Sequence, residues 1–150
     1  MALSLRAGFS YVQLLLVVAL LVILAGISAP YYLTWQARQQ LRTTSSMLWA
    51  DLHYAQSRAM QREQDAGWGV HFDNSTHSYT LFHGSTYLSS DVYNETIQYS
   101  SNVTITPTTD IAFAGLTGEV TSPITYTITS NSLPTETETI SINVEGLIAQ

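Results

Sequence analysis

The sequence predicts an α+β fold in which one long N-terminal α-helix packs by its second half on an antiparallel β-sheet head. Three observations predict this class. Residues 9–33 carry no charged side chain, residues 34–66 repeat apolar side chains at helical spacing, and several later stretches alternate apolar and polar side chains. A chain of 150 residues has room for one domain and an appended segment. We therefore divide it into residues 1–8, 9–33, 34–66 and a head of residues 67–150.

The apolar segment, residues 9–33, is long enough to cross a membrane. As a helix it would span roughly 37 Å, against about 30 Å for the hydrocarbon core of a bilayer. A cleaved secretory signal peptide is one competing interpretation, but the apolar stretch of a signal peptide has only about 7–15 residues. Ile27 and Pro30 are also unfavourable around a cut after Ala29. A plain uncleaved anchor is the other. The run is long for a signal peptide, and its length suits a single-pass transmembrane helix.

The amphipathic stem, residues 34–66, continues the same helix. Its apolar side chains recur every three, four or seven residues, together with the last residue of the apolar segment. They are Leu33, Ala37, Leu41, Leu48, Leu52, Ala55 and Ala59. We expect one helix from Phe9 to Gln64, roughly 84 Å long if straight, with an exit just before Gly67.

The head begins with a predicted hairpin. The runs GWGVHF and SYTLF are joined by DNSTH, and this spacing pairs Phe72 with Tyr79 and Val70 with Leu81. Further strands are predicted where period-two alternation appears, which indicates sheets that bury one face. Their inward residues are Ile124, Tyr126 and Ile128 in one strand and Ile140, Ile142 and Val144 in the next. Residues 130–138 form the loop between them, and Gly115 and Gly118 mark a turn.

Charge is distributed unevenly along the chain. All five basic residues are arginines at or before Arg62, whereas all acidic residues except Asp51 lie at or after Glu63. A head without lysine or arginine repels phosphate backbones, so we expect no nucleic-acid partner. The chain has no cysteine, which excludes disulfides and thiolate metal sites.

No catalytic or metal-binding pattern stands out. The predicted hairpin register places His71 and His83 on opposite faces, and no histidine pair has zinc-ligand spacing. No serine stands in a Gly-x-Ser-x-Gly elbow. Glu136 and Glu138 are expected to face solvent, with weak calcium binding left open because calcium needs six to eight oxygens held together. We predict no enzyme activity and no cofactor.

The N-terminal pattern Arg6-Ala7-Gly8 followed by FSYVQLLLVV resembles the N-termini of type IV prepilins and type II secretion pseudopilins. The resemblance implies a leader of residues 1–8, cleavage by prepilin peptidase between Gly8 and Phe9, and N-methylation of Phe9. It also implies that residues 9–33 anchor the subunit in the inner membrane first, with the head outside the cytoplasm, and then form the core of a filament.

Gln13 departs from the family pattern, which has a glutamate there that is thought to neutralise a neighbouring subunit's N-terminal amine. A glutamine can accept a hydrogen bond from that amine but brings no opposite charge to an apolar core. Gln13 therefore favours a minor or initiating subunit, although it is also consistent with a plain polar contact between packed helices. Pro30 lies where pilin stems bend or partly melt, and its alternative role is a simple kink.

The run MLWADLHYAQSRAMQREQDAGWGVHF and the C-terminal ETISINVEGLIAQ resemble the H-type minor pseudopilins and the related FimT-like minor pilins. This implies a structural subunit of a type II secretion pseudopilus or a type IV pilus. Its partners would be other pilins or pseudopilins, prepilin peptidase, the inner-membrane assembly platform and membrane lipid. The alternative is a membrane-tethered binding or adhesin head on a pilin-type anchor. The sequence leaves the machine, the cargo and the position in the filament open.

Overall fold

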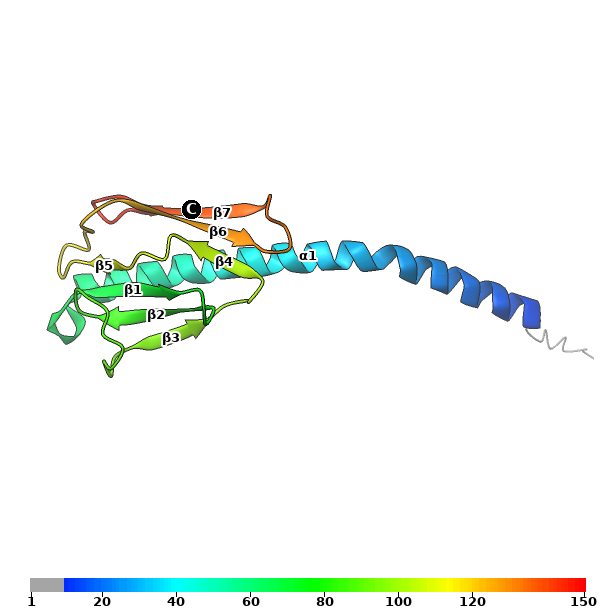
Figure 1. Ribbon diagram of the computed structural model, residues 1–150, viewed down its shortest axis with the longest axis horizontal. Coiled ribbons are helices and arrows are strands. Elements are labelled where there is room, and N and C mark those ends of the chain that lie inside the picture. The colour runs from blue at the N-terminus through cyan, green and yellow to red at the C-terminus, as the bar shows by residue number, and fades with distance from the viewer. Residues whose placement is uncertain (1–9) are drawn as a thin grey trace, which may run out of the picture. The chain divides into compact units, whose positions relative to one another are not determined.

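The computed structural model describes residues 10–150, with the side chains of residues 25–30 excepted. The chain forms two compact units, one through Trp35 and one from Gln36 to Gln150. The long helix α1 covers Tyr11–Met60 and so belongs to both (Figure 1). The fold class is α+β, as the sequence predicts.

The described part of the first unit is one helical stretch whose side chains are exposed. From Tyr11 to Leu24 every described large apolar side chain is exposed, and so are Tyr31, Tyr32 and Trp35. Leu33, which the helical periodicity assigned to the buried face, is 66% exposed because it lies before the part of α1 that meets the head. Among the described residues, no helix combines the length and the apolar character that a membrane crossing requires.

In the second unit, one face of α1 lies in the core. Its buried apolar residues are Ala37, Leu41, Leu48, Leu52, Ala55 and Ala59, as the spacing predicts. The predicted end at Gln64 is wrong, because α1 ends at Met60. Arg62 then takes a left-handed conformation with φ of 52°, which leads into the 3₁₀ turn η1 (Glu63–Asp65).

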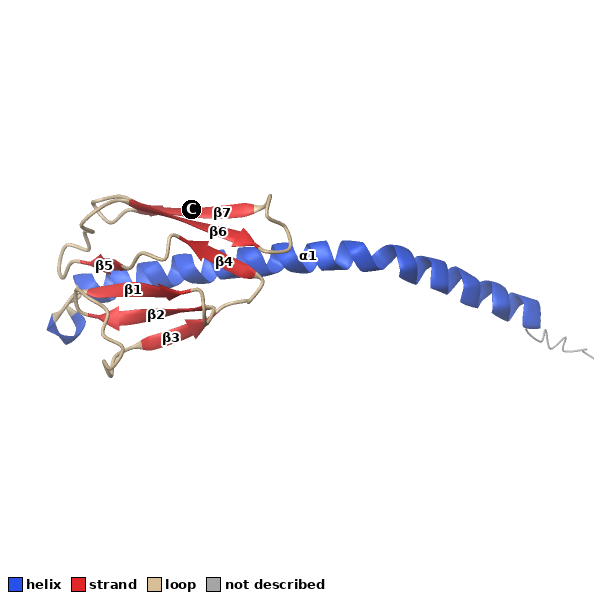
Figure 2. Ribbon diagram, in the orientation of Figure 1, coloured by secondary structure: helices blue, strands red, loops and turns tan. Residues whose placement is uncertain are grey.

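Two four-stranded antiparallel sheets complete the head (Figure 2). The first has the order β3-β2-β1-β5 and the second has the order β4-β6-β7-β8. The strands of the first sheet are β1 (Trp68–Asp73), β2 (Ser78–His83), β3 (Glu95–Gln98) and β5 (Ile111–Phe113). Those of the second are β4 (Val103–Thr106), β6 (Ile124–Ser130), β7 (Thr137–Ile142) and β8 (Ile148–Ala149).

Both pairings predicted for the hairpin are confirmed, and the two stretches of alternating isoleucine and threonine form neighbouring strands. In the β1–β2 hairpin Phe72 pairs with Tyr79 and Val70 with Leu81. Tyr126 pairs with Ile140 between β6 and β7, and both are buried. Val144 was expected to continue this buried row, but β7 ends at Ile142 and Val144 is half exposed in the following turn.

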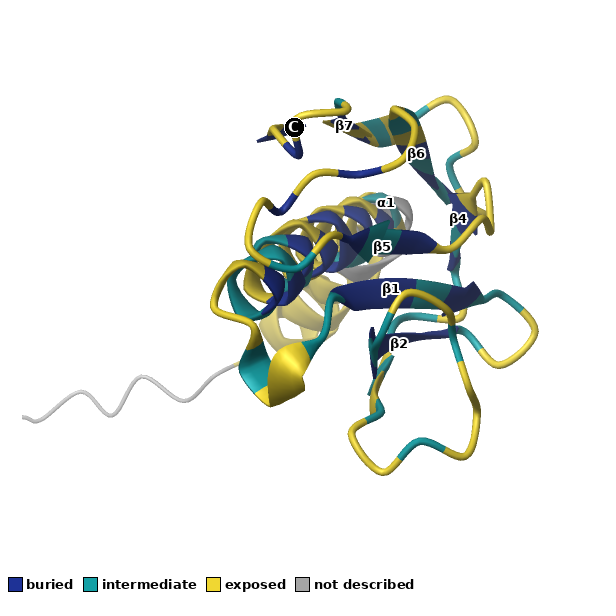
Figure 3. Ribbon diagram, turned by 90° about the vertical axis from the view of Figure 1, so that its left-hand side faces the viewer, coloured by how far each residue is buried: buried dark blue, intermediate teal, exposed yellow. Residues whose placement is uncertain are grey.

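The core of the head lies between α1 and the inward faces of both sheets, as the buried segments in Figure 3 show. Trp68, Tyr79, Phe113 and Tyr126 are its large fully buried side chains, together with aliphatic residues of α1. Because aromatic side chains of this size each bury about 150–250 Å², they dominate the hydrophobic contribution to stability. This packing holds the head on the second half of α1.

Candidate functional site

Three of the sequence-predicted site residues lie beyond what the structure describes in full. Gly8 and Phe9 fall outside the described residues. Pro30 lies within α1, and its side chain is not among those described. Their roles in cleavage, methylation and helix bending stay predictions.

Gln13, the fourth predicted residue, caps the start of α1. Its side-chain Oε1 accepts a hydrogen bond from the Ser10 backbone N–H at 3.1 Å. The Gln13 and Leu14 backbone N–H groups in turn donate to the Ser10 carbonyl at 2.9 and 3.2 Å. A glutamine three residues after a serine is the sequence signature of a capping box, in which the third residue reaches back to the cap residue's N–H. This role was readable from the sequence and was missed.

The head is attached to α1 through Arg58. Its guanidinium lies over the Trp68 ring, 3.6 Å from the ring centroid, and its side chain is only 11% exposed. Nε and Nη2 donate to the two carboxylate oxygens of Glu63 at 2.9 and 2.8 Å, and Nη1 donates to Glu95 at 2.6 Å. The hydrogen bonds from Arg58 lower the pKa of the Glu63 carboxyl. One side chain thus joins α1, the turn after it, β1 and β3.

Further polar contacts join α1 to β2 and to turns beside the strands of the second sheet. The Tyr79 hydroxyl donates to Asp51 at 2.5 Å, and Gln56 Nε2 donates to the carbonyls of Gly118 and Gly146 at 3.2 and 2.7 Å. Glu136, which was expected to face solvent or bind calcium weakly, accepts a hydrogen bond from Arg38 at 2.8 Å. These contacts link α1 to the head.

The four histidines are used in separate local contacts. His71 stacks on Tyr87 and bonds to Asp110 through Nδ1 at 2.7 Å. His83 lies beside Trp68 and Tyr93, His77 beside Tyr99 and His53 beside Trp49. Among the described residues, no three histidine or carboxylate side chains are arranged to hold a metal ion.

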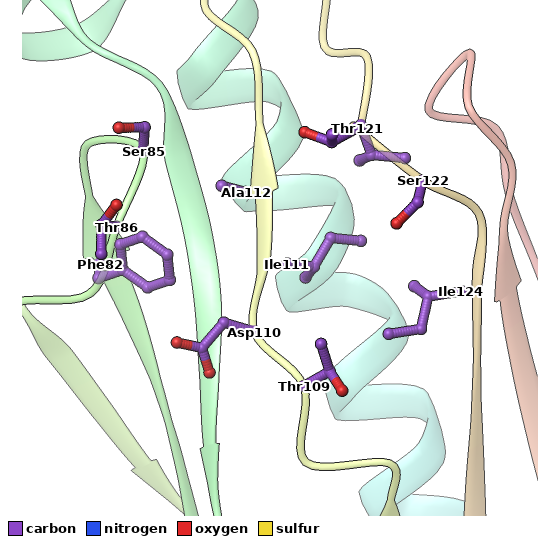
Figure 4. Close-up of a pocket in the computed structure, with 11 residues that line it drawn as sticks. Phe82, Ser85, Thr86, Thr109, Asp110, Ile111, Ala112, Thr121, Ser122 and Ile124 are labelled. Carbon is purple, nitrogen blue, oxygen red and sulfur yellow. The ribbon is translucent and has the colours of Figure 1, made fainter.

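A shallow groove of about 230 Å³ lies beside β5. Ser85 and Thr86 border it on one side and Thr121 and Ser122 on the other, with Asp110 and Ala112 between them (Figure 4). The lining mixes hydroxyl groups with apolar side chains and one carboxylate. The carboxylate of the lining, Asp110, is already hydrogen-bonded to His71.

Comparison with known proteins places the chain in a family. The family described as "Type II transport protein GspH" matches residues 46–146, which cover most of the stem and nearly all of the head. No curated protein matches the sequence.

The solved structures that it resembles share its fold at low sequence identity. The type IV minor pilin FimU of Pseudomonas aeruginosa strain PAO1 matches with 18% identity and a TM-score of 0.59, over 75% of this chain and 88% of FimU. A second crystal form of FimU matches with 17% identity and a TM-score of 0.56, over 73% and 90%. The type 2 secretion minor pseudopilin EpsH of Vibrio cholerae matches with 16% identity and a TM-score of 0.56, over 73% and 94%.

The resemblance inferred from the N-terminus is therefore confirmed through an independent part of the chain, because the family match begins only at residue 46. Members of this family are structural subunits rather than enzymes. The chain belongs to the GspH family of type II transport proteins, and its fold is similar to that of the minor pilin and minor pseudopilin structures above.

Proposed function

We propose that prepilin peptidase cuts this subunit after Gly8, that residues 9–33 then anchor it in the inner membrane, and that the mature chain enters a type II secretion pseudopilus or a type IV pilus. The observation that carries the proposal is the combination of a GspH-type head with an uncharged N-terminal segment after Gly8. In a filament subunit, an apolar segment that the head does not bury would pack against other subunits.

The exposed surface of the first unit supports this proposal. Leu14, Leu20 and Ile23 are all more than half exposed, although they point to different sides of the helix. A helix that is apolar on all sides needs lipid or apolar neighbours on all sides, since exposed apolar surface costs about 25 cal/mol per Å². Membrane lipid before assembly and other subunits' helices after it would provide those surroundings.

Aromatic side chains at the end of the uncharged segment support the proposed membrane anchoring. Tyr31, Tyr32 and Trp35 are exposed at the end of the uncharged run, and the Tyr32 and Trp35 rings lie 6.2 Å apart. Aromatic side chains with a polar atom favour the boundary between membrane and water. They would hold the end of the anchor at the outer face of the inner membrane, and the assembly platform would meet the subunit there.

Co-expression with prepilin peptidase tests the processing step. We expect the wild-type chain to lose the mass of residues 1–8 only when the peptidase is present, and to remain in the membrane fraction. A Gly8→Glu variant should keep its full mass and remain in the membrane as well. Loss of the whole apolar segment, or peptidase-independent cleavage, would contradict the proposal and favour a signal peptide.

A further inference from the structure

Leu116 is held in a conformation that leucine rarely adopts. Its φ is +76°, in the left-handed region that glycine occupies without steric cost. Its side chain is 64% exposed, so no burial in the head offsets that cost. A glycine or an asparagine would fit this turn better on backbone grounds alone. A strained residue with an exposed apolar side chain is a reason to look for a function at that place.

Other exposed apolar side chains lie on segments that meet the turn holding Leu116. We name the head patch by its four members, Met60, Leu116, Val144 and Leu147, which are 44–66% exposed. The Leu116 backbone N–H donates to the Ala59 carbonyl at 3.1 Å, which places the turn beside the end of α1.

The two turns that carry the head patch are joined through α1. Gln56 donates to both Gly118 and Gly146, and the Val120 N–H donates to the Val144 carbonyl at 3.1 Å. A Cβ added at Gly118 would lie 2.9 Å from Met60 Cγ, so Met60 packs against that turn. The head patch therefore comes from three segments that are far apart in the sequence and meet at these turns.

The head patch has an acidic border. Glu119 follows the first turn, and Glu145 lies between Val144 and Gly146. Both side chains are exposed, and neither takes part in the ion pairs found among the described residues. A partner for this surface would combine apolar or aromatic side chains with a cation.

The stem of the same chain has that chemistry. We name the stem face by Arg42, Ser46 and Trp49, whose spacing of four and three residues places them on one side of α1. All three are exposed, and Arg42 is in none of the ion pairs of the described residues. Arginine and tryptophan are also the side chains most enriched among energetically important interface residues.

We propose that the head patch binds the stem face of a second copy of this chain. The patch would receive Trp49 on its apolar centre, and Glu119 and Glu145 would meet Arg42. The two surfaces are different, so the contact is heterologous and does not form a symmetric dimer. This inference rests on the proposed function, since it describes how such subunits meet outside the membrane.

Cysteine cross-linking in the full-length chain tests the contact, because the natural sequence has no cysteine. One tagged copy carries Thr117→Cys beside the head patch, and a second, differently tagged copy carries Ser46→Cys on the stem face. On mild oxidation of membranes we expect a disulfide-linked pair that contains both tags. A copy with Ser89→Cys, in the exposed β2–β3 loop, is the matched control and should give at least tenfold less of this product.

Substitution of Leu116 separates the contact from folding. Leu116→Gly and Leu116→Asn remove the apolar side chain and suit the left-handed backbone. We expect them to keep or raise the thermal midpoint of the full chain in detergent and to lower the cross-link yield at least fivefold. Val92→Asn, which changes an 88% exposed side chain outside the patch, should leave the yield unchanged.

The outcomes distinguish the inference from the proposed function. A processed, membrane-bound chain that gives no product linking position 117 to position 46, or whose yield is unaffected by Leu116→Gly, would overturn the inference alone. A product that links position 117 to the stem of a different pilin would overturn the choice of a second copy as the partner. A chain that is not retained in membranes would contradict the proposed function and the contact together.

Discussion

The Arg58 guanidinium lies 3.6 Å from the centroid of the Trp68 ring and joins the long helix to the first strand of the head. Arginine suits this position because its planar group can stack on an indole while its N–H groups bond to two carboxylates. Those carboxylates, on Glu63 and Glu95, are 41% and 50% exposed, so the ion pairs themselves contribute little to stability. The stacking is the larger contribution.

Arg58→Lys should therefore destabilise the head. A lysine keeps the charge but cannot stack its plane on Trp68 or bond to Glu63 through two N–H groups. We expect a loss of about 1–2 kcal/mol in the free energy of unfolding, measured by urea denaturation. Arg42→Lys, at an exposed position of the same helix, is the control and should change stability by less than about 0.5 kcal/mol. Equal effects of the two variants would contradict the role of stacking.

Alkaline pH should destabilise the head through its buried tyrosines. Burial raises the pKa of the Tyr79 phenol, and the hydrogen bond to Asp51 raises it further. Burial likewise raises the pKa of Tyr126, and the charge of Asp110 adds to the effect. Because these pKa values are higher in the folded state, their contribution is fully present below the unfolded pKa of about 10 and is lost as pH rises above it.

The urea midpoint measured between pH 8 and pH 11 checks this dependence. We expect the wild-type midpoint to fall steeply above pH 10, and the double variant Tyr79→Phe, Tyr126→Phe to show a smaller fall. The double variant will also be less stable at pH 8, since Asp51 loses its hydroxyl donor. Tyr54→Phe, at a half-exposed position, should follow the wild-type curve. Parallel curves for wild type and double variant would contradict the argument.

Gly69 is required by the close packing of β1. A Cβ there would overlap the Ile111 carbonyl oxygen of β5 and would lie 2.5 Å from Cζ of Phe82. Gly69→Ala should destabilise the head by about 2–3 kcal/mol, because the backbone of β5 cannot move aside without breaking its pairing with β1. Gly115→Ala is the matched control, since its nearest neighbours would be 3.7 Å away. The two thermal midpoints should differ by several degrees, and equal midpoints would rule out this packing.

Gln13→Glu tests the meaning of the missing glutamate. The carboxylate can still accept the hydrogen bond from the Ser10 N–H, and a negative charge is favourable at a helix N-terminus. In a filament it could also neutralise a neighbour's amine. We expect more of the variant than of the wild type in sheared filaments, measured by quantitative immunoblotting. Gln13→Ala should remove the cap without adding a charge, and unchanged abundance of Gln13→Glu would refute the charge argument.

The parts of the fold with strong local patterns could be predicted from the sequence. The equal distances of the two strands from the central DNSTH turn predicted the β1–β2 register. Alternation of isoleucine with threonine predicted β6 and most of β7. The helical spacing of leucine and alanine identified the buried face of α1. In each case a periodic pattern several residues long shows which face of the helix or strand packs on the core.

The missed features have no such pattern. The strands β3, β4 and β5 have only three or four residues, too few to show period two clearly. The helix ends at Met60, and Arg62 and Gln64 just after it take positive φ values. Neither arginine nor glutamine favours such a conformation, so the sequence gives no sign of this end. Leu116 is a similar case, since nothing local marks a leucine that will take a left-handed conformation. The cap made by Gln13 is different, because its signature was present in the sequence.

Maturation of the N-terminus is the step on which the proposed function depends most directly. The decisive measurement is the N-terminal sequence and intact mass of the chain isolated from sheared surface or periplasmic filaments. We predict a chain that begins at Phe9, with the added mass of one methyl group, and that retains every residue to Gln150. A chain that begins at Met1, or one that has lost the apolar segment up to Ala29, would contradict the account.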